Sequence, residues 1–159
     1  MTIINEGLSE LIRKGGLYSG LRGTNPREIL GAFIGALPSI PSVQADKLLT
    51  AVLEREALMS TGIGGGIALP HPRNPLAATE GERFVALAFL ETAVNWNSLD
   101  GEKVDTLLLI VSSSAKQHLQ TLSEITFFCR QNDFRRLLKD RAPLEELLSF
   151  IEEAEKNWK

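Results

Sequence analysis

Two uninterrupted apolar runs in the middle of the chain limit the folds that it can adopt. They cover residues 84–90 and 107–111 and contain no charged side chain. A strand with one face in water alternates apolar and polar residues, so unbroken runs of this kind indicate strands that are buried on both faces. Between the two runs, residues 99–102 (Leu-Asp-Gly-Glu) predict a turn, and residues 94–97 predict a short additional strand.

Helical patterns precede and follow these runs. Asn25, Pro26 and Glu28 supply the cap, the first-turn proline and the third-position acid that are typical of a helix start. Strands buried on both faces need helices on either side, so the order of elements indicates the α/β class, with a sheet sandwiched between helices. The predicted helices cover about residues 8–14, 26–37, 42–56, 116–129, 133–138 and 143–155.

Length and charge narrow the range of function classes. The chain of 159 residues suits one compact domain, 1–159, and its net charge of −3 argues against a nucleic-acid binder. It contains no apolar run of 18 residues and no basic-then-apolar start, so we expect neither direct membrane insertion nor a signal peptide. The single cysteine, Cys129, cannot form an internal disulfide, so a reducing, cytoplasmic setting is the expectation.

The stretch from Glu56 to His71 carries the main functional signal. It contains glycines at positions 62, 64, 65 and 66, and it ends in Ile67-Ala-Leu-Pro-His71. Glycine permits backbone geometries and close approaches that side chains forbid. We therefore expect this loop to let another molecule reach the imidazole of His71.

This stretch resembles the active-site pattern of the type-2 enzyme IIA domains of the bacterial phosphotransferase system (PTS). The family pattern has an acidic or amide residue, six free positions, an aliphatic residue, Gly or Ala, two free positions, and then aliphatic-Ala-aliphatic-Pro-His and a small residue. Glu56, Ile63, Gly64 and the run from Ile67 to His71 match it, and only the last place departs, because Pro72 stands there. Residues 55–64 look most like the nitrogen-regulatory branch of the family.

The resemblance implies both a fold and an activity. The fold is a mixed sheet of about five strands between helices. The activity is that of a phosphotransferase component, a phosphocarrier that accepts a phosphoryl group from the phosphohistidine of HPr or of its nitrogen-branch counterpart. The group then passes to a IIB domain, or the carrier reports its phosphorylation state to regulatory target proteins. No cofactor is implied.

The resemblance also assigns the site residues. His71 is the phosphoryl acceptor, usually at Nε2, and a neutral imidazole is a nucleophile suited to that role. Arg55 lies sixteen residues before it, at the spacing of the family's arginine, and His118 matches the family's second histidine. Residues 112–118 precede a helical pattern, so we expect His118 near a helix N-terminus, which favours anions. The expected loop that binds the phosphoryl group and the partner comprises Ser60, Thr61, Gly62, Gly64, Gly65 and Gly66.

Several alternatives remain open at the level of sequence. Pro72 removes an N–H group, so it either stiffens the loop or marks a site with altered transfer. A protein that keeps the fold as an interaction module, without carrying phosphate, is the rival function. Ser60 and Thr61 are also common turn-formers. The glycines match neither the dinucleotide nor the P-loop pattern, and two histidines 47 positions apart without a nearby cysteine argue against a metal site.

Overall fold

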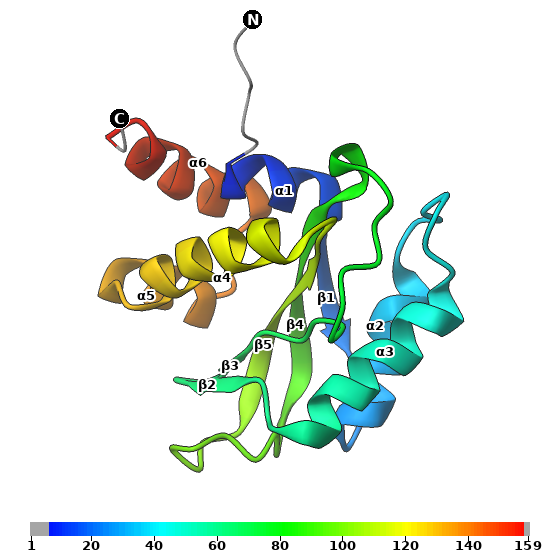
Figure 1. Ribbon diagram of the computed structural model, residues 1–159. Coiled ribbons are helices and arrows are strands. Elements are labelled where there is room, and N and C mark those ends of the chain that lie inside the picture. The colour runs from blue at the N-terminus through cyan, green and yellow to red at the C-terminus, as the bar shows by residue number, and fades with distance from the viewer. Residues whose placement is uncertain (1–6, 158–159) are drawn as a thin grey trace, which may run out of the picture.

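A computed structural model describes residues 7–157 as an α/β fold in which helices surround one mixed sheet (Figure 1). The predicted sandwich of helices and sheet is confirmed. The strands are β1 (Leu17–Leu21), β2 (Gly62–Gly64), β3 (Ile67–Ala68), β4 (Phe84–Val94) and β5 (Val104–Val111). The helices are α1 (Leu8–Gly15), α2 (Pro26–Ala36), α3 (Ala45–Leu58), the 3₁₀ helix η1 (Glu80–Glu82), α4 (Ala115–Cys129), α5 (Asn132–Lys139) and α6 (Leu144–Glu155).

The sheet has the strand order β1-β4-β5-β3-β2. Its centre is the antiparallel pair of β4 and β5, which the two apolar runs predicted. β1 runs parallel to β4, and β3 runs parallel to β5, whereas β2 folds back antiparallel to β3. The parallel pairing of β3 and β5 brings the end of the glycine-rich stretch beside the strand that leads into α4.

Both faces of the sheet are covered, which explains why its central strands are apolar throughout. Along β4, Val85 and Leu87 join one buried cluster, while Ala86 and Ala88 join the other. The first cluster includes side chains of α1, α4, α5 and α6, and the second includes side chains of α2 and α3. Figure 1 shows these two helical layers on opposite sides of the strands.

Side-chain caps determine where two of the helices begin. The side chain of Asn25 accepts a hydrogen bond from the backbone N–H of Glu28, and Pro26 occupies the first turn of α2, as predicted. Ser114 caps α4 in the same way, by accepting from the N–H of Gln117 at 3.2 Å. The cap fixes where α4 begins, and therefore places His118 in its first turn.

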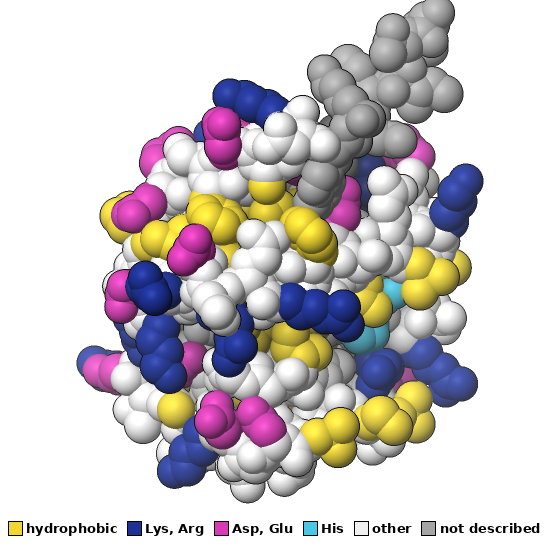
Figure 2. Space-filling view, turned by 90° about the vertical axis from the view of Figure 1, so that its left-hand side faces the viewer, with side chains coloured by type: hydrophobic (Ala, Val, Ile, Leu, Met, Phe, Trp, Pro, Cys, Tyr) yellow, Lys and Arg dark blue, Asp and Glu magenta, His cyan; other side chains and the backbone are white. Residues whose placement is uncertain are grey.

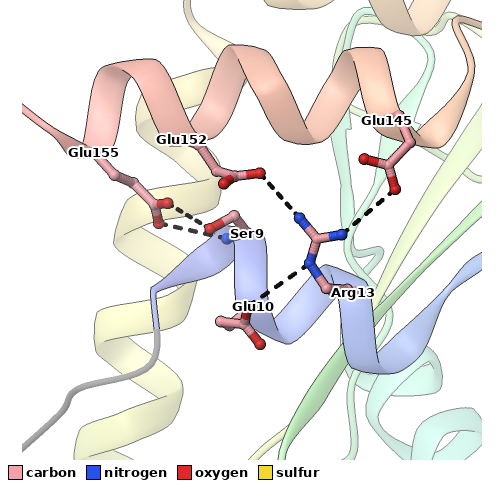
Figure 3. A network of polar contacts seen from close by, with 6 residues as sticks. All are labelled: Ser9, Glu10, Arg13, Glu145, Glu152 and Glu155. Carbon is pink, nitrogen blue, oxygen red and sulfur yellow. Dashed lines mark hydrogen bonds and ion pairs between the residues drawn. The ribbon is translucent and has the colours of Figure 1, made fainter.

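Polar contacts join α1 to α6 on the outside of the larger helical layer (Figure 3). Arg13 forms ion pairs with Glu145 and Glu152 of α6, and solvent-exposed pairs of this kind contribute little stability. Glu155 has a more structural role, because its carboxylate accepts hydrogen bonds from the N–H and the hydroxyl of Ser9. It thereby caps the first turn of α1, whose N-cap residue, Gly7, has no side chain to do so.

The sequence prediction of strands was wrong in two respects. Residues 94–97 do not form a separate strand, because Val94 ends β4 and pairs with Val104. Trp96 is buried and its two neighbours are exposed, and this alternation is the pattern that a strand would show. The backbone is not extended there, however, because Asn97 has φ 58°. The prediction also missed β1, β2 and β3. None of the described helices is long and apolar enough to cross a bilayer.

Candidate functional site

The two histidines of the chain meet at one edge of the sheet. His71 follows β3, and His118 lies on α4, which follows β5. Because β3 and β5 are parallel, their carboxyl ends lie at the same edge, and the N–H of Ile110 donates to the carbonyl of Pro70 at 3.0 Å to continue the pairing. The ring centroids of His71 and His118 are 4.6 Å apart, with an interplanar angle of 41°.

A backbone contact fixes the orientation of the His71 ring. Its Nδ1 lies 2.8 Å from the carbonyl oxygen of Leu69. A carbonyl oxygen can only accept, so the neutral ring donates from Nδ1 and carries its lone pair on Nε2. The contact therefore leaves the lone pair, and with it the nucleophilic character of the neutral ring, on Nε2.

Both rings are held neutral. Burial lowers the pKa of His71, and the positive charge of Arg55 lowers it further, against the opposing effects of the Leu69 carbonyl and of Glu56. Burial, His71 and Arg55 together lower the pKa of His118 to about 4. At neutral pH the site therefore contains two uncharged imidazoles, of which each offers one N–H donor and one lone pair.

Arg55 acts on both rings from the last turn of α3. Its Nη1 donates to the carbonyl of Met59 at 2.8 Å, which satisfies a carbonyl at the end of the helix and anchors the guanidinium there. The three residues that the sequence selected for chemistry, His71, His118 and Arg55, are thus within electrostatic reach of one another. A fixed cation beside two neutral imidazoles is suited to an anionic group.

Ser60 and Thr61 make hydrogen bonds that shape the chain between α3 and β2. The hydroxyl of Thr61 and its N–H both donate to the carboxylate of Glu56, at 2.6 and 2.7 Å. The Ser60 hydroxyl donates to the carbonyl of Trp96 and accepts from the N–H of Gly62. These contacts are those of turn-formers, and a role for either hydroxyl at the phosphoryl group stays a prediction.

Three of the four glycines form the turn of the hairpin between β2 and β3. Gly64, Gly65 and Gly66 have φ values of 92°, 65° and 82°, a conformation that favours glycine. The N–H of Gly65 donates to Asp100, and a Cβ on Gly65 would lie 2.8 Å from the guanidinium of Arg135. Gly62 lies in β2, where a Cβ would meet the hydroxyl of Ser98. The observed role of the glycines is to close the hairpin, and their role in admitting a partner to His71 stays a prediction.

A small cavity beside His118 adds residues that the sequence analysis did not assign. Its volume is about 200 Å³, and Arg73, Pro72 and Leu119 are among its lining residues. Pro72 is buried, whereas Leu119 is 64% exposed. The sequence could have indicated Arg73 as a residue near the site, because it lies only two residues after His71. Figure 2 shows histidine side chains at the surface, among hydrophobic and cationic ones.

Glu56 is a further residue whose place was not foreseen. It was recognised only as the first position of the pattern, but its carboxylate links α3 to Thr61 and its charge raises the pKa of His71. Among the described residues, no three His, Cys, Asp or Glu side chains are grouped closely enough to hold a metal ion.

Comparison with known proteins identifies the family. The sequence model of the EIIA 2 family, described as phosphoenolpyruvate-dependent sugar phosphotransferase system, EIIA 2, matches residues 25–154. The nitrogen regulatory protein of Pseudomonas aeruginosa is 27% identical over 147 residues, which cover 91% of this chain and 94% of that protein.

Solved structures agree with this fold. The nitrogen regulatory protein IIA-Ntr of Neisseria meningitidis superposes with a TM-score of 0.78 at 21% identity, over 90% of this chain and 97% of that one. The mannitol IIA in a complex with phosphorylated mannitol IIB from Escherichia coli gives a TM-score of 0.59 at 16% identity, over 85% and 92% of the two chains. The chain therefore belongs to the EIIA 2 family of the phosphoenolpyruvate-dependent sugar phosphotransferase system.

Proposed function

We propose that this protein is a phosphocarrier that accepts a phosphoryl group on Nε2 of His71. The observation that carries the proposal is the arrangement of three side chains. The neutral ring of His71 donates a hydrogen bond from Nδ1 to the Leu69 carbonyl, and its centroid lies 4.6 Å from that of the neutral His118 ring. The charge of Arg55 acts on both rings. Membership of the EIIA 2 family supports the same role.

The chemistry follows from these contacts. The Nε2 lone pair attacks the phosphorus of a donor phosphohistidine, a P–N bond forms to His71, and the P–N bond to the donor ring breaks. The ring gains positive charge as the bond forms, and the Nδ1–H donated to the Leu69 carbonyl stabilises that charge. No proton has to leave His71 for the transfer to occur.

His118 and Arg55 stabilise the phosphoryl group in this proposal. The transferred group spreads negative charge over its oxygens, so positioned donors are the main catalytic resource. A neutral His118 supplies an N–H, and Arg55 supplies a cation without consuming a proton. Pro72 lacks an N–H, so the residue after His71 contributes no backbone donor.

The proposed donor is HPr or its nitrogen-branch counterpart. Similarity to nitrogen regulatory proteins favours an outcome in regulation, in which the phosphorylation state governs binding to target proteins. Transfer to a IIB domain is the second candidate, which the complex of the mannitol IIA with phosphorylated IIB supports. The proposed setting is the cytoplasm, where such donors operate.

Mass spectrometry tests the acceptor directly. Incubation with phosphoenolpyruvate, enzyme I and an HPr-type donor should add about 80 Da to the wild type and nothing to His71→Ala. The donors should include both sugar-branch and nitrogen-branch forms. If the wild type gains no mass with any of them, the protein is an interaction module that keeps the fold without carrying phosphate.

The role of His118 is tested by the rate of that reaction. His118→Ala should reach the same final mass, roughly tenfold or more slowly, because a donor to the phosphoryl oxygens is lost while the acceptor remains. His118→Gln, which keeps an N–H donor, should recover part of the rate. Wild-type kinetics in His118→Ala would remove this residue from the mechanism.

A further inference from the structure

The outward face of α4 combines cations with apolar side chains and contains no acid. The exposed residues of this helix, together with the residue that ends it, are Ala115, Lys116, Leu119, Gln120, Ser123, Phe127 and Arg130. Leu119 follows His118 directly, so this face begins at the histidine pair. In a chain with a net charge of −3, a helix face without an acidic side chain is a local concentration of positive charge.

The surface is hollowed on both sides of this face. The cavity of about 200 Å³ beside His118 is lined in part by Leu119 and Arg73. A larger hollow, of about 540 Å³, lies between the β2–β3 hairpin and the C-terminal half of α4, and it is lined in part by Ile63 and Arg130. We call α4 with these two hollows the α4 surface. Exposed apolar groups beside hollows and cations are suited to receive the side chains of another protein (Figure 2).

The cations of the α4 surface are not neutralised from within the molecule. Arg73, Lys116 and Arg130 are exposed, and none of them forms an ion pair with another residue of the described chain. Two carboxylates near the surface, those of Glu56 and Asp100, each accept two hydrogen bonds from the residues around them. The three cations are therefore free to pair with the carboxylates of a partner.

We propose that the phosphoryl donor docks on the α4 surface through a face whose apolar centre is bordered by carboxylates. This inference rests on the phosphocarrier function proposed above and adds the chemistry of the donor's surface. Leu119 and Ile63 contact the apolar centre, and Arg73, Lys116 and Arg130 pair with the carboxylates around it.

The dimensions of the helix agree with a single docked protein. The face from Lys116 to Arg130 is about 21 Å long, because each helical residue adds about 1.5 Å. An interface that buries about 800 Å² of each partner is roughly 30 Å across, so one donor covers this face while its phosphohistidine lies at His71. Arg130 is then far from the reacting atoms, about 18 Å along the axis from His118, and its charge serves docking alone.

The rate of phosphoryl transfer at different donor concentrations tests this proposal. The probes are the phosphorylated sugar-branch and nitrogen-branch forms of HPr, and the faster of the two is used. Arg130→Glu should raise the half-saturating donor concentration roughly fivefold or more and leave the maximum rate within about twofold of the wild type. Raising the salt from about 50 to about 300 mM should slow transfer to the wild type at low donor concentration, and should slow transfer to Arg130→Glu less.

Matched variants separate the charge from its position. Arg130→Lys keeps the cation and should stay close to the wild type, and Arg27→Glu makes the same charge reversal on α2 and should have no effect. Leu119→Ser should raise the half-saturating concentration without changing the dependence on salt, because it removes only apolar contact.

Two kinds of failure are distinguishable. If the wild type is phosphorylated but Arg130→Glu saturates at the same donor concentration, or if salt accelerates transfer, the donor does not dock through carboxylates on this surface and the phosphocarrier function stands. If neither donor phosphorylates the wild type, the phosphocarrier function fails, and the docking proposal fails with it.

Discussion

At the residue scale, Arg55 and Glu56 are neighbours on α3 whose charges act on His71 in opposite directions. Arg55→Gln removes a cation and should raise the pKa of His71, and also that of His118. Glu56→Gln removes an anion and should lower the pKa of His71. Both shifts should be smaller than the effect of burial, which is the largest cause of the lowered pKa. A pH titration of the imidazole signals by nuclear magnetic resonance measures both.

The control for these two variants is Arg27→Gln, which removes an exposed cation from α2. It should leave both histidine signals unchanged. Shifts of the same sign in Arg55→Gln and Glu56→Gln would show that a change in burial, and not the two charges, governs the rings. Since burial is the largest cause of both lowered pKa values, neither substitution should bring His118 to an ordinary histidine pKa.

The sequence indicated the three candidate residues that the structure brings together, but it did not indicate their surroundings. His71 was recognisable from the pattern that precedes it, and Arg55 and His118 from their spacing to that pattern. The hydrogen bond of Nδ1 to Leu69 and the bonds from Thr61 to Glu56 depend on how β3 pairs with β5. No one-dimensional pattern encodes that pairing.

At the element scale, the hairpin of β2 and β3 depends on glycine where α2 does not. Gly65→Ala should lower the free energy of unfolding by about 1–2 kcal/mol, because its φ of 65° is strained for alanine and Arg135 is close. Gly31→Ala, inside α2 with open space around it, should raise that free energy by about 0.5–1 kcal/mol. Urea unfolding of the two variants checks both signs.

The two substitutions make the same chemical change, so each is the control for the other. Destabilisation by both would mean that α2 is packed more tightly at Gly31 than its open surroundings indicate. A neutral Gly65→Ala would show that the hairpin turn can adopt another conformation. The second result would weaken the assignment of the glycine cluster to turn formation.

The accuracy of the sequence prediction varied with the length of the elements. Long helices and the strands at the centre of the sheet carry enough repeats of their pattern to be recognised, and the cap at Asn25 gave the start of α2. β2 and β3 have only three and two residues, two of them glycines in β2, so neither shows any periodicity. β1 is interrupted by Gly20, none of its residues is fully buried, and its place in the sheet depends on tertiary contacts with β4 and α2.

At the scale of the whole molecule, acidic side chains of two helices, Glu124 of α4 and Glu155 of α6, lie close enough for their charges to interact. Glu124 of α4 is half-buried, and burial, reinforced by the charge of Glu155 on α6, raises its pKa to about 7 despite the opposing charge of Arg83. Glu155 in turn caps α1 through Ser9. The protonation of one carboxyl is therefore linked to the packing of three helices.

The sign of the effect on stability follows from the raised pKa. The folded state binds the Glu124 proton more tightly than the unfolded state does, so this group favours folding most below pH 4.5, the ordinary value. That contribution is lost as the pH rises from there through about 7. Because Glu124 is partly exposed, we expect solvent to reduce the total to about 1–2 kcal/mol.

Glu124→Gln should remove this dependence, because a glutamine side chain imitates the neutral acid at every pH. Its unfolding free energy, measured in urea, should rise relative to that of the wild type by about 1–2 kcal/mol between about pH 5 and pH 8. The exposed Glu146→Gln on α6 is the control and should run parallel to the wild type over that range. A parallel profile for Glu124→Gln as well would mean that Glu155 and Arg83 compensate each other at Glu124, and that the three helices pack independently of its proton.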